Sequence, residues 1–138
     1  MTDTPFRPVL RTQADVEQMW RRLMRPLGFG SESLWVIVIE GEKPVPHILE
    51  IVELGEPPDA DEIEAYAGVL EPLTGPDTRF AMLLSRPGGG RPDATDRAWA
   101  RALYAAGRHA GARLEMIHLA HDHDIYPLAL DDLLAEPA

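Results

Sequence analysis

Residues 34–39 form the segment that most constrains the fold of this chain. They are an uninterrupted run of apolar residues, four of which are Val or Ile. Such a run is typical of a central strand that is buried on both faces, because a strand with one wet face alternates apolar and polar residues. Helical patterns flank the run in the sequence, so we expect an α/β fold in which helices cover a sheet.

The rest of the chain alternates between helical and extended patterns. Further strands are expected at 47–53, 79–84, 114–119 and 125–130, and helices at 12–24, from Asp59 or Asp61 to Leu70, and from Asp93 onward. Residues 40–43 read as a turn, which would pair 34–39 and 47–53 as a hairpin and argues against a purely parallel sheet. The prediction is a single-domain three-layer sandwich with a mixed β-sheet.

The last long helix has two contrasting faces. Its apolar face would carry Trp99, Leu103, Ala106 and Ala110. The remaining positions include Arg97, Arg101, Tyr104 and Arg108, and we interpret that face as solvated.

The chain of 138 residues suits one domain. We expect a flexible N-terminal arm at 1–10, a folded domain at 11–134 and a C-terminal tail at 135–138. No apolar run approaches the roughly 20 residues of a membrane span, and the acidic start is unlike a signal peptide. The expectation is a cytoplasmic protein that does not bind a membrane.

Charge and cysteine content exclude several kinds of chemistry. Thirteen basic residues stand against 23 acidic ones, a net charge of −10, which disfavours nucleic acid as a partner. The absence of cysteine excludes disulfides, thiolate ligands and a Cys/His dyad. No Gly-x-Ser-x-Gly nucleophile elbow occurs either.

The segment 85–96 joins an apolar strand to a helix and contains three consecutive glycines at 88–90. Backbone amides before a helix can hold an anion. This segment lacks the Lys-Ser/Thr of a phosphate-binding loop, however, and Asp93 and Asp96 would repel phosphate. We therefore interpret the glycines as a flexible connection.

Residues 121–124, His-Asp-His-Asp, are the densest group of metal-ligand side chains. Alternate residues of an extended segment point to opposite sides, so His121 and His123 would need a third ligand, and His118 is the nearest. A polar turn between two strands is the favoured interpretation. A metal site at His118, His121 and His123 is the alternative.

Taken together, these segments resemble the RadC-like branch of the JAB/MPN metalloprotease family. That branch has a strand preceded by Glu, a strand ending in His-x-His-Pro-Ser-Gly, a Pro-Ser-x-x-Asp helix start and a later strand bearing Asp-His. Glu32 matches the glutamate, 84–89 the first motif, 92–96 the second and Ile117-His118 the third, while Leu10-Arg11-Thr12 and the helix through Trp20 match the start. The resemblance covers most of 10–130 and implies a JAB/MPN-like, cytidine-deaminase-like fold.

The chain departs from this pattern at the metal ligands. In active members two histidines and the aspartate hold zinc and the glutamate is the general base; here the histidine positions carry Leu84 and Arg86. Arginine is permanently charged and would repel Zn²⁺. Asp93 stands at the place of the serine, and only Glu32 and Asp96 are kept. The resemblance thus implies a vestigial pocket of Glu32, Leu84, Arg86, Asp93, Asp96 and His118, with Arg86 paired to Asp96 or Glu32.

The expected function is a catalytically inactive JAB/MPN-like domain without cofactor or metal. It would act as a cytoplasmic interaction or scaffold module for an unknown protein partner, and a homodimer is possible. One alternative is a metal-dependent hydrolase whose site has moved to His118, His121 and His123 with Asp96 or Glu32. Another is a sensor that binds a small anion at Arg86, Arg91 and the glycine turn.

Overall fold

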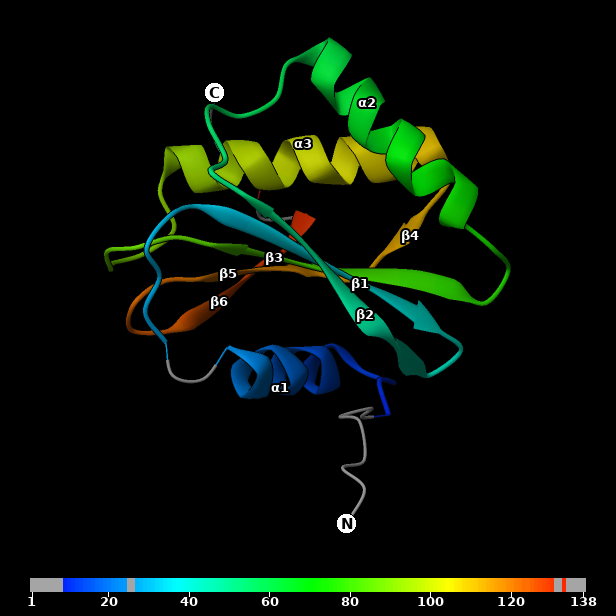
Figure 1. Cartoon of the computed structure of the whole chain (residues 1–138), viewed down its shortest axis with the longest axis horizontal. Coiled ribbons are helices and arrows are strands. Elements are labelled where there is room, and N and C mark those ends of the chain that lie inside the picture. Colours follow the sequence, from blue (N-terminus) through cyan, green and yellow to red (C-terminus); the bar gives the residue numbers. More distant parts are fainter. Residues whose placement is uncertain (1–8, 25–26, 131–132, 134–138) are drawn as a thin grey trace.

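A computed structural model describes residues 9–24, 27–130 and 133 of the chain, without the side chains of Pro46 and His47. Within this part the structure has three α-helices, α1 (Gln13–Leu23), α2 (Ala60–Leu70) and α3 (Ala94–Ala110), and a 3-10 turn at Glu71–Leu73 (Figure 1). The strands are β1 (Ser33–Glu40), β2 (Lys43–Val52), β3 (Thr78–Ser85), β4 (Arg113–Leu114), β5 (Ile117–Ala120) and β6 (Ile125–Leu128). None of the described helices is both long and apolar enough to cross a membrane.

The six strands form one mixed sheet in the order β2-β1-β3-β5-β6, and β4 pairs with β3 beside β5. β1 and β2 form the antiparallel hairpin that the sequence predicts, with Leu34 opposite Ile51. β3 runs antiparallel to β1 but parallel to β4 and β5. The predicted mixed sheet is therefore confirmed.

Helices cover both faces of the sheet, as predicted (Figure 1). α1 lies on one face, and α2 and α3 lie together on the other. β1 contributes side chains to the hydrophobic cores on both faces of the sheet. Leu34 and Val36 belong to the core beneath α3, whereas Ile37 and Ile39 belong to the core beneath α1. This alternation explains why every residue of its central run is apolar.

Each helix begins with a reciprocal pair of side-chain hydrogen bonds. Thr12 caps α1 together with Asp15, and Asp93 caps α3, as the sequence indicates. Of the two candidates for α2, Asp59 is the cap. A capping pair holds the first turn of a helix in one geometry, and in α3 that turn carries a pocket residue, Asp96.

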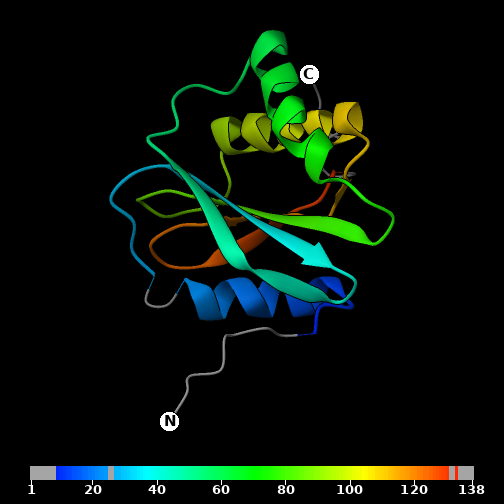
Figure 2. The ribbon, with the colours of Figure 1, turned by 45° about the vertical axis from the view of Figure 1, so that its right-hand side comes forward.

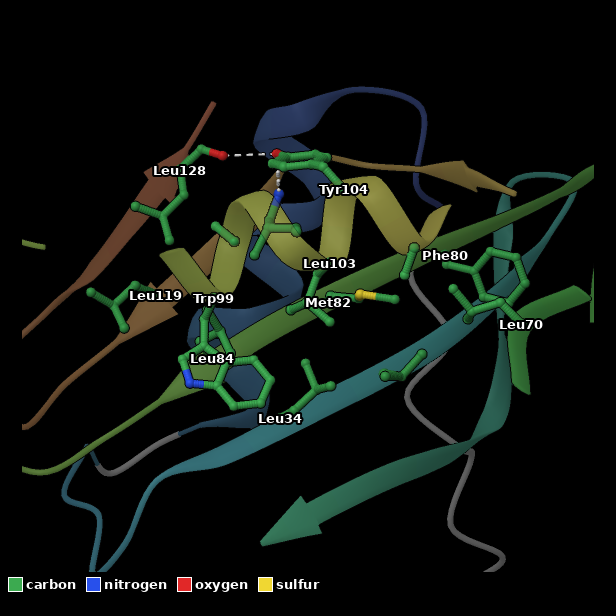
Figure 3. Packing of buried hydrophobic residues seen from close by; sticks show 14 of the residues in the cluster. Leu34, Leu70, Phe80, Met82, Leu84, Trp99, Leu103, Tyr104, Leu119 and Leu128 are labelled. Carbon is green, nitrogen blue, oxygen red and sulfur yellow. Dashed lines mark hydrogen bonds between the residues drawn. The ribbon is translucent and has the colours of Figure 1, made fainter. Parts of the chain in front are cut away.

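The predicted strand at 114–119 is in fact two strands, β4 and β5, separated by Glu115 and Met116. Across the break the register against β3 shifts by one residue, because Leu114 lies opposite Phe80 whereas His118 lies opposite Leu83. Tyr104, which the sequence predicts on the solvated face of the helix, is instead buried. Its hydroxyl donates to the Leu128 carbonyl at 2.8 Å and accepts from the Ile117 amide at 2.9 Å (Figure 3).

The predicted N-terminal arm extends too far along the chain. Leu10 is fully buried in the core beneath α1. Its amide donates to the Glu42 carbonyl at 2.6 Å, and its carbonyl accepts from Arg79 at 2.7 Å. An apolar side chain and two backbone bonds place this residue in the domain. Residues 1–8, the predicted tail at 135–138 and Pro26 lie outside the described residues; of the two residues that the sequence predicts to end the first helix, Pro26 and Gly28, only Gly28 is described.

Candidate functional site

A cavity of about 220 Å³ lies where the end of β3 meets the first turn of α3. Five of the six predicted pocket residues line it: Glu32, Leu84, Arg86, Asp93 and Asp96. Leu84 and Arg86 are two positions apart at the end of an extended strand, so their side chains point to the same side. The topology therefore gathers at one place residues that are spread over more than sixty positions of sequence.

The centre of the pocket is a forked ion pair between Arg86 and Asp96. Arg86 Nε donates to both carboxylate oxygens of Asp96, at 2.9 and 3.1 Å, and Nη2 donates to Oδ2 at 2.9 Å. The side chains are 15% and 7% exposed respectively. The hydrogen bonds to Asp96 raise the pKa of Arg86 above its ordinary value. Of the two pairings that the sequence left open, the structure contains Arg86–Asp96.

The helix start fixes Asp96 from its other side. Its Oδ2 also accepts from the Asp93 amide at 2.8 Å, and the Asp93 carboxylate accepts from the Asp96 amide at 2.8 Å. This backbone hydrogen bond is the largest of the effects that lower the pKa of Asp93. Asp96 thus completes the capping box of α3 and also accepts from Arg86, so its carboxylate is held from two sides.

The remaining lining does not suit an anion. Glu32 is exposed, and within the described residues no ion-pair partner faces its carboxylate. Three carboxylates thus share the cavity with one guanidinium that is already paired. Arg91 lines a different hollow, beside Pro92 and Leu133. The two arginines of the predicted anion sensor therefore do not converge.

His118 lies on the opposite face of the sheet, so its assignment to the pocket is wrong. Its Nε2 lies 3.8 Å from Glu17 Oε1 of α1, whereas the next residue, Leu119, lines the pocket. The cause is the two-residue period of a strand, which sends neighbouring side chains to opposite faces. A motif match identifies the strand on which a residue lies, but not the face of the sheet to which its side chain points.

The environment of His118 is unusual for a histidine. The side chain is fully buried, and neither ring nitrogen has a hydrogen-bond partner among the described residues. Burial lowers the pKa of His118, and the nearby Glu17 carboxylate offsets only part of this effect. The ring is therefore held as the neutral form.

Residues 121–124 form a turn between β5 and β6, as the favoured interpretation predicts. The buried His121 stabilises it, because Nδ1 accepts from the amides of His123 and Asp124 at 3.0 and 3.2 Å. Across 9–24, 27–130 and 133, no three His, Cys, Asp or Glu side chains are grouped so that they could hold a metal. The alternative site at His118, His121 and His123 is therefore not assembled.

Asp122 has a role that the sequence did not reveal. Its carboxylate accepts from the Gly88 amide at 2.8 Å and from the Phe29 amide at 3.0 Å. These two backbone bonds lower the pKa of Asp122. They attach the glycine turn to two other loops, so the turn is tethered at Gly88 rather than a free connection.

Replacing Asp122 with alanine is expected to loosen the glycine turn, which keeps the backbone hydrogen bond from residue 122 to the Gly88 carbonyl. The amides of Gly88 and Phe29 lose their acceptor, so their hydrogen exchange should accelerate while the amides of β3 stay protected. Asp124→Ala is the matched control, because Asp124 lies in the same turn but pairs with Arg21 at 3.1 Å. Equal acceleration in both variants would contradict a specific tether.

The fold and the pocket define an α/β domain with an ion-paired cavity at the end of its sheet. Comparison with protein-family models and with curated proteins finds no match to this chain.

Proposed function

We propose that the chain is a catalytically inactive JAB/MPN-like domain, related to the RadC-like branch, that works as a protein-interaction module. The order of elements, α-β-β-α-β-α-β-β with a short extra strand, agrees with the order that the resemblance implies. The cavity also lies at the strand-to-helix junction where the family binds zinc. Both observations support the family relationship on geometry rather than on residue identity.

The observation that carries the proposal is the forked pair of Arg86 and Asp96. A catalytic zinc needs about three protein ligands and one open position. Asp96 is the one ligand kept from the family pattern, and both of its oxygens are bonded to a guanidinium. Arg86 therefore supplies the positive charge that a metal would supply, and the pocket is closed by an internal contact.

Glu32 and Asp93, which stand at the positions of the family's general base and serine, cannot perform those catalytic roles in this pocket. A general base such as Glu32 acts on a metal-bound water, and the described part of the chain brings no set of ligands for that metal into the pocket. Asp93 stands where the family has a serine, and its negative charge would oppose a developing oxyanion. The pocket therefore supplies neither a metal ion to activate water nor a donor to stabilise an oxyanion, and both are needed for the family's hydrolysis.

The surface supports binding instead. β2 is an edge strand, and Ile48, Leu49 and Val52 are exposed on it. Open edges are places where a second chain can pair, and proteins usually protect them. Here Pro44 and Pro46 protect one end of the strand, since proline donates no backbone hydrogen bond, while 47–52 is left unprotected by proline.

Metal analysis tests the proposal directly. We expect the purified, untagged protein to contain no stoichiometric zinc and its Tm to be unchanged by a chelator. In contrast, Leu84→His/Arg86→His should bind about one zinc per chain, because two imidazoles then flank Asp96. Adding Asp96→Asn to that variant should weaken the binding again.

Two results would contradict the proposal. Stoichiometric zinc in the natural protein would mean that the pocket is a working metal site. A correctly folded Leu84→His/Arg86→His variant without zinc affinity would mean that the pocket does not have the geometry of the family's metal site.

A further inference from the structure

A second hollow adjoins the ion-paired pocket and has no role in the function proposed above. It is a groove of about 520 Å³ between the end of β2, the connection 53–59 and α2. Figure 2 shows this connection rising from the sheet to the helical layer. The groove shares Leu54, Gly55 and Trp99 with the pocket. Its size lies in the range of sites that hold a ligand or a short peptide segment.

Two aromatic side chains belong to the groove lining. Tyr66 and Trp99 meet edge to face, with ring centroids 6.2 Å apart. The Trp99 indole donates to the Gly55 carbonyl at 3.2 Å, which attaches the connection 53–59 to α3. Ile51, Leu54 and Pro57 add apolar wall, so the groove has a hydrophobic lining that is formed before any partner binds.

Four carboxylates complete this lining: Glu53, Glu56, Asp59 and Glu62. Among the described residues, no arginine or lysine lines the groove. Glu62 even contributes, after burial, to the raised pKa of Tyr66, because negative charge beside a phenol disfavours its ionised form. The groove therefore combines aromatic surface with negative charge that is not neutralised within it.

That combination selects for arginine. A guanidinium can lie against an aromatic ring and still form forked hydrogen bonds with carboxylates, which a lysine ammonium cannot do. The same carboxylates would repel phosphate groups, so nucleic acid and anionic membranes do not suit this surface. Val52 is exposed on the open edge of β2 and also lines the groove, so an extended backbone could run beside it.

We propose that this groove binds an extended, arginine-bearing segment of a partner protein. The inference rests on the proposed function as an interaction module and names the chemistry of the partner. The partly exposed Tyr66 ring, held edge to face by the buried Trp99, receives an arginine side chain. The carboxylates fix its charge, and the neighbouring strand edge directs the backbone.

The test is a titration with a short capped peptide that alternates arginine and alanine. Peptides with glutamate or with glutamine in place of arginine serve as probes of charge. Binding is measured by calorimetry, and the Trp99 indole N–H signal in NMR spectra reports whether the groove is occupied. We expect the arginine peptide alone to bind and to shift that signal, and its affinity to fall as salt is added.

The key variant is Glu53→Gln/Glu56→Gln, which removes two exposed charges without altering the α2 cap. We expect it to weaken arginine-peptide binding about tenfold. The matched control is Glu71→Gln/Asp77→Asn, which removes the same charge from exposed positions outside the groove. It should change the affinity by less than about twofold.

Three outcomes would overturn the inference: no binding of the arginine peptide, an unshifted Trp99 signal, or equal weakening in the two double variants. Zinc content measured on the same sample separates this failure from that of the proposed function. A zinc-free protein that ignores the peptide loses only the groove assignment. A protein with stoichiometric zinc loses the proposed function whether or not the peptide binds.

Discussion

Asp96→Ala is expected to lower the free energy of unfolding by about 3 kcal/mol. Removing one partner of a buried ion pair leaves the other charge without compensation. Arg86 would lose the acceptor of its Nε and Nη2 donors, and the Asp93 amide would lose its cap. We place the effect at the lower end of the range for buried pairs because Arg86 retains 15% exposure and can draw water.

A double-mutant cycle in urea isolates the pairing itself. Arg86→Met alone should cost less, since Asp96 still accepts from the Asp93 amide at the start of α3. Arg86→Met/Asp96→Ala should be more stable than the sum of the single losses predicts, by about 2 kcal/mol. Additive losses would show that the two side chains do not act as a pair, and would also remove the main support for a closed pocket.

Acidification from pH 7 to pH 5 is expected to destabilise the protein through His118. Burial lowers the pKa of this ring in the folded state below the ordinary 6.5. The unfolded chain therefore takes up a proton first as the pH falls, and stability is lost from about pH 6.5 downward. One proton gives a slope of at most about 1.4 kcal/mol per pH unit.

The variant His118→Leu should be nearly flat over the same interval. Urea titrations at several pH values measure the difference. Glu17 and Arg21 are the charged groups that act on the ring, and both are kept in the variant. The lowered pKa values of Asp93, Asp122 and Asp124 act only below their ordinary 3.8, outside this window.

His109→Gln is the matched control for removing a histidine. His109 is exposed on α3, where its ring contacts Glu64, so this variant removes a histidine while the buried His118 ring is kept. If His118→Leu kept the slope of the natural protein, the loss of stability would have to come from another group, and the neutral buried ring would not be its cause.

Local pattern was sufficient to predict most of the elements, whereas the grouping of the pocket residues was an expectation from the family resemblance. The apolar run at 34–39 predicted a strand buried on both faces, and Asp93 marked the start of α3, three positions before Asp96. The pairing of Arg86 with Asp96 was one of two arrangements open from the sequence. Choosing between the two pairings requires knowing how close the end of β3 lies to the first turn of α3, and the spacing of residues along the sequence does not give that distance.

Faces and long-range tethers were the features that the sequence could not supply. His118 was placed in the pocket because its strand was right, yet a shift of one residue on a strand reverses the face. Tyr104 reads as a polar position on a helix, but its hydroxyl joins two strands that follow it in the chain. Asp122 read as part of a polar turn, and its carboxylate in fact also holds two other loops.

The sequence by itself determined the α/β class of fold and the inability of the Leu84 and Arg86 side chains to ligate a metal. These follow from hydrophobic period and residue chemistry, which are properties of short segments. Only the tertiary structure decided that Arg86 pairs with Asp96 rather than with Glu32, and that Tyr66 and Trp99 meet beside four carboxylates. The physical reason is that ion pairs, burial and grooves depend on which surfaces the packed sheet and helices bring within a few ångströms of one another.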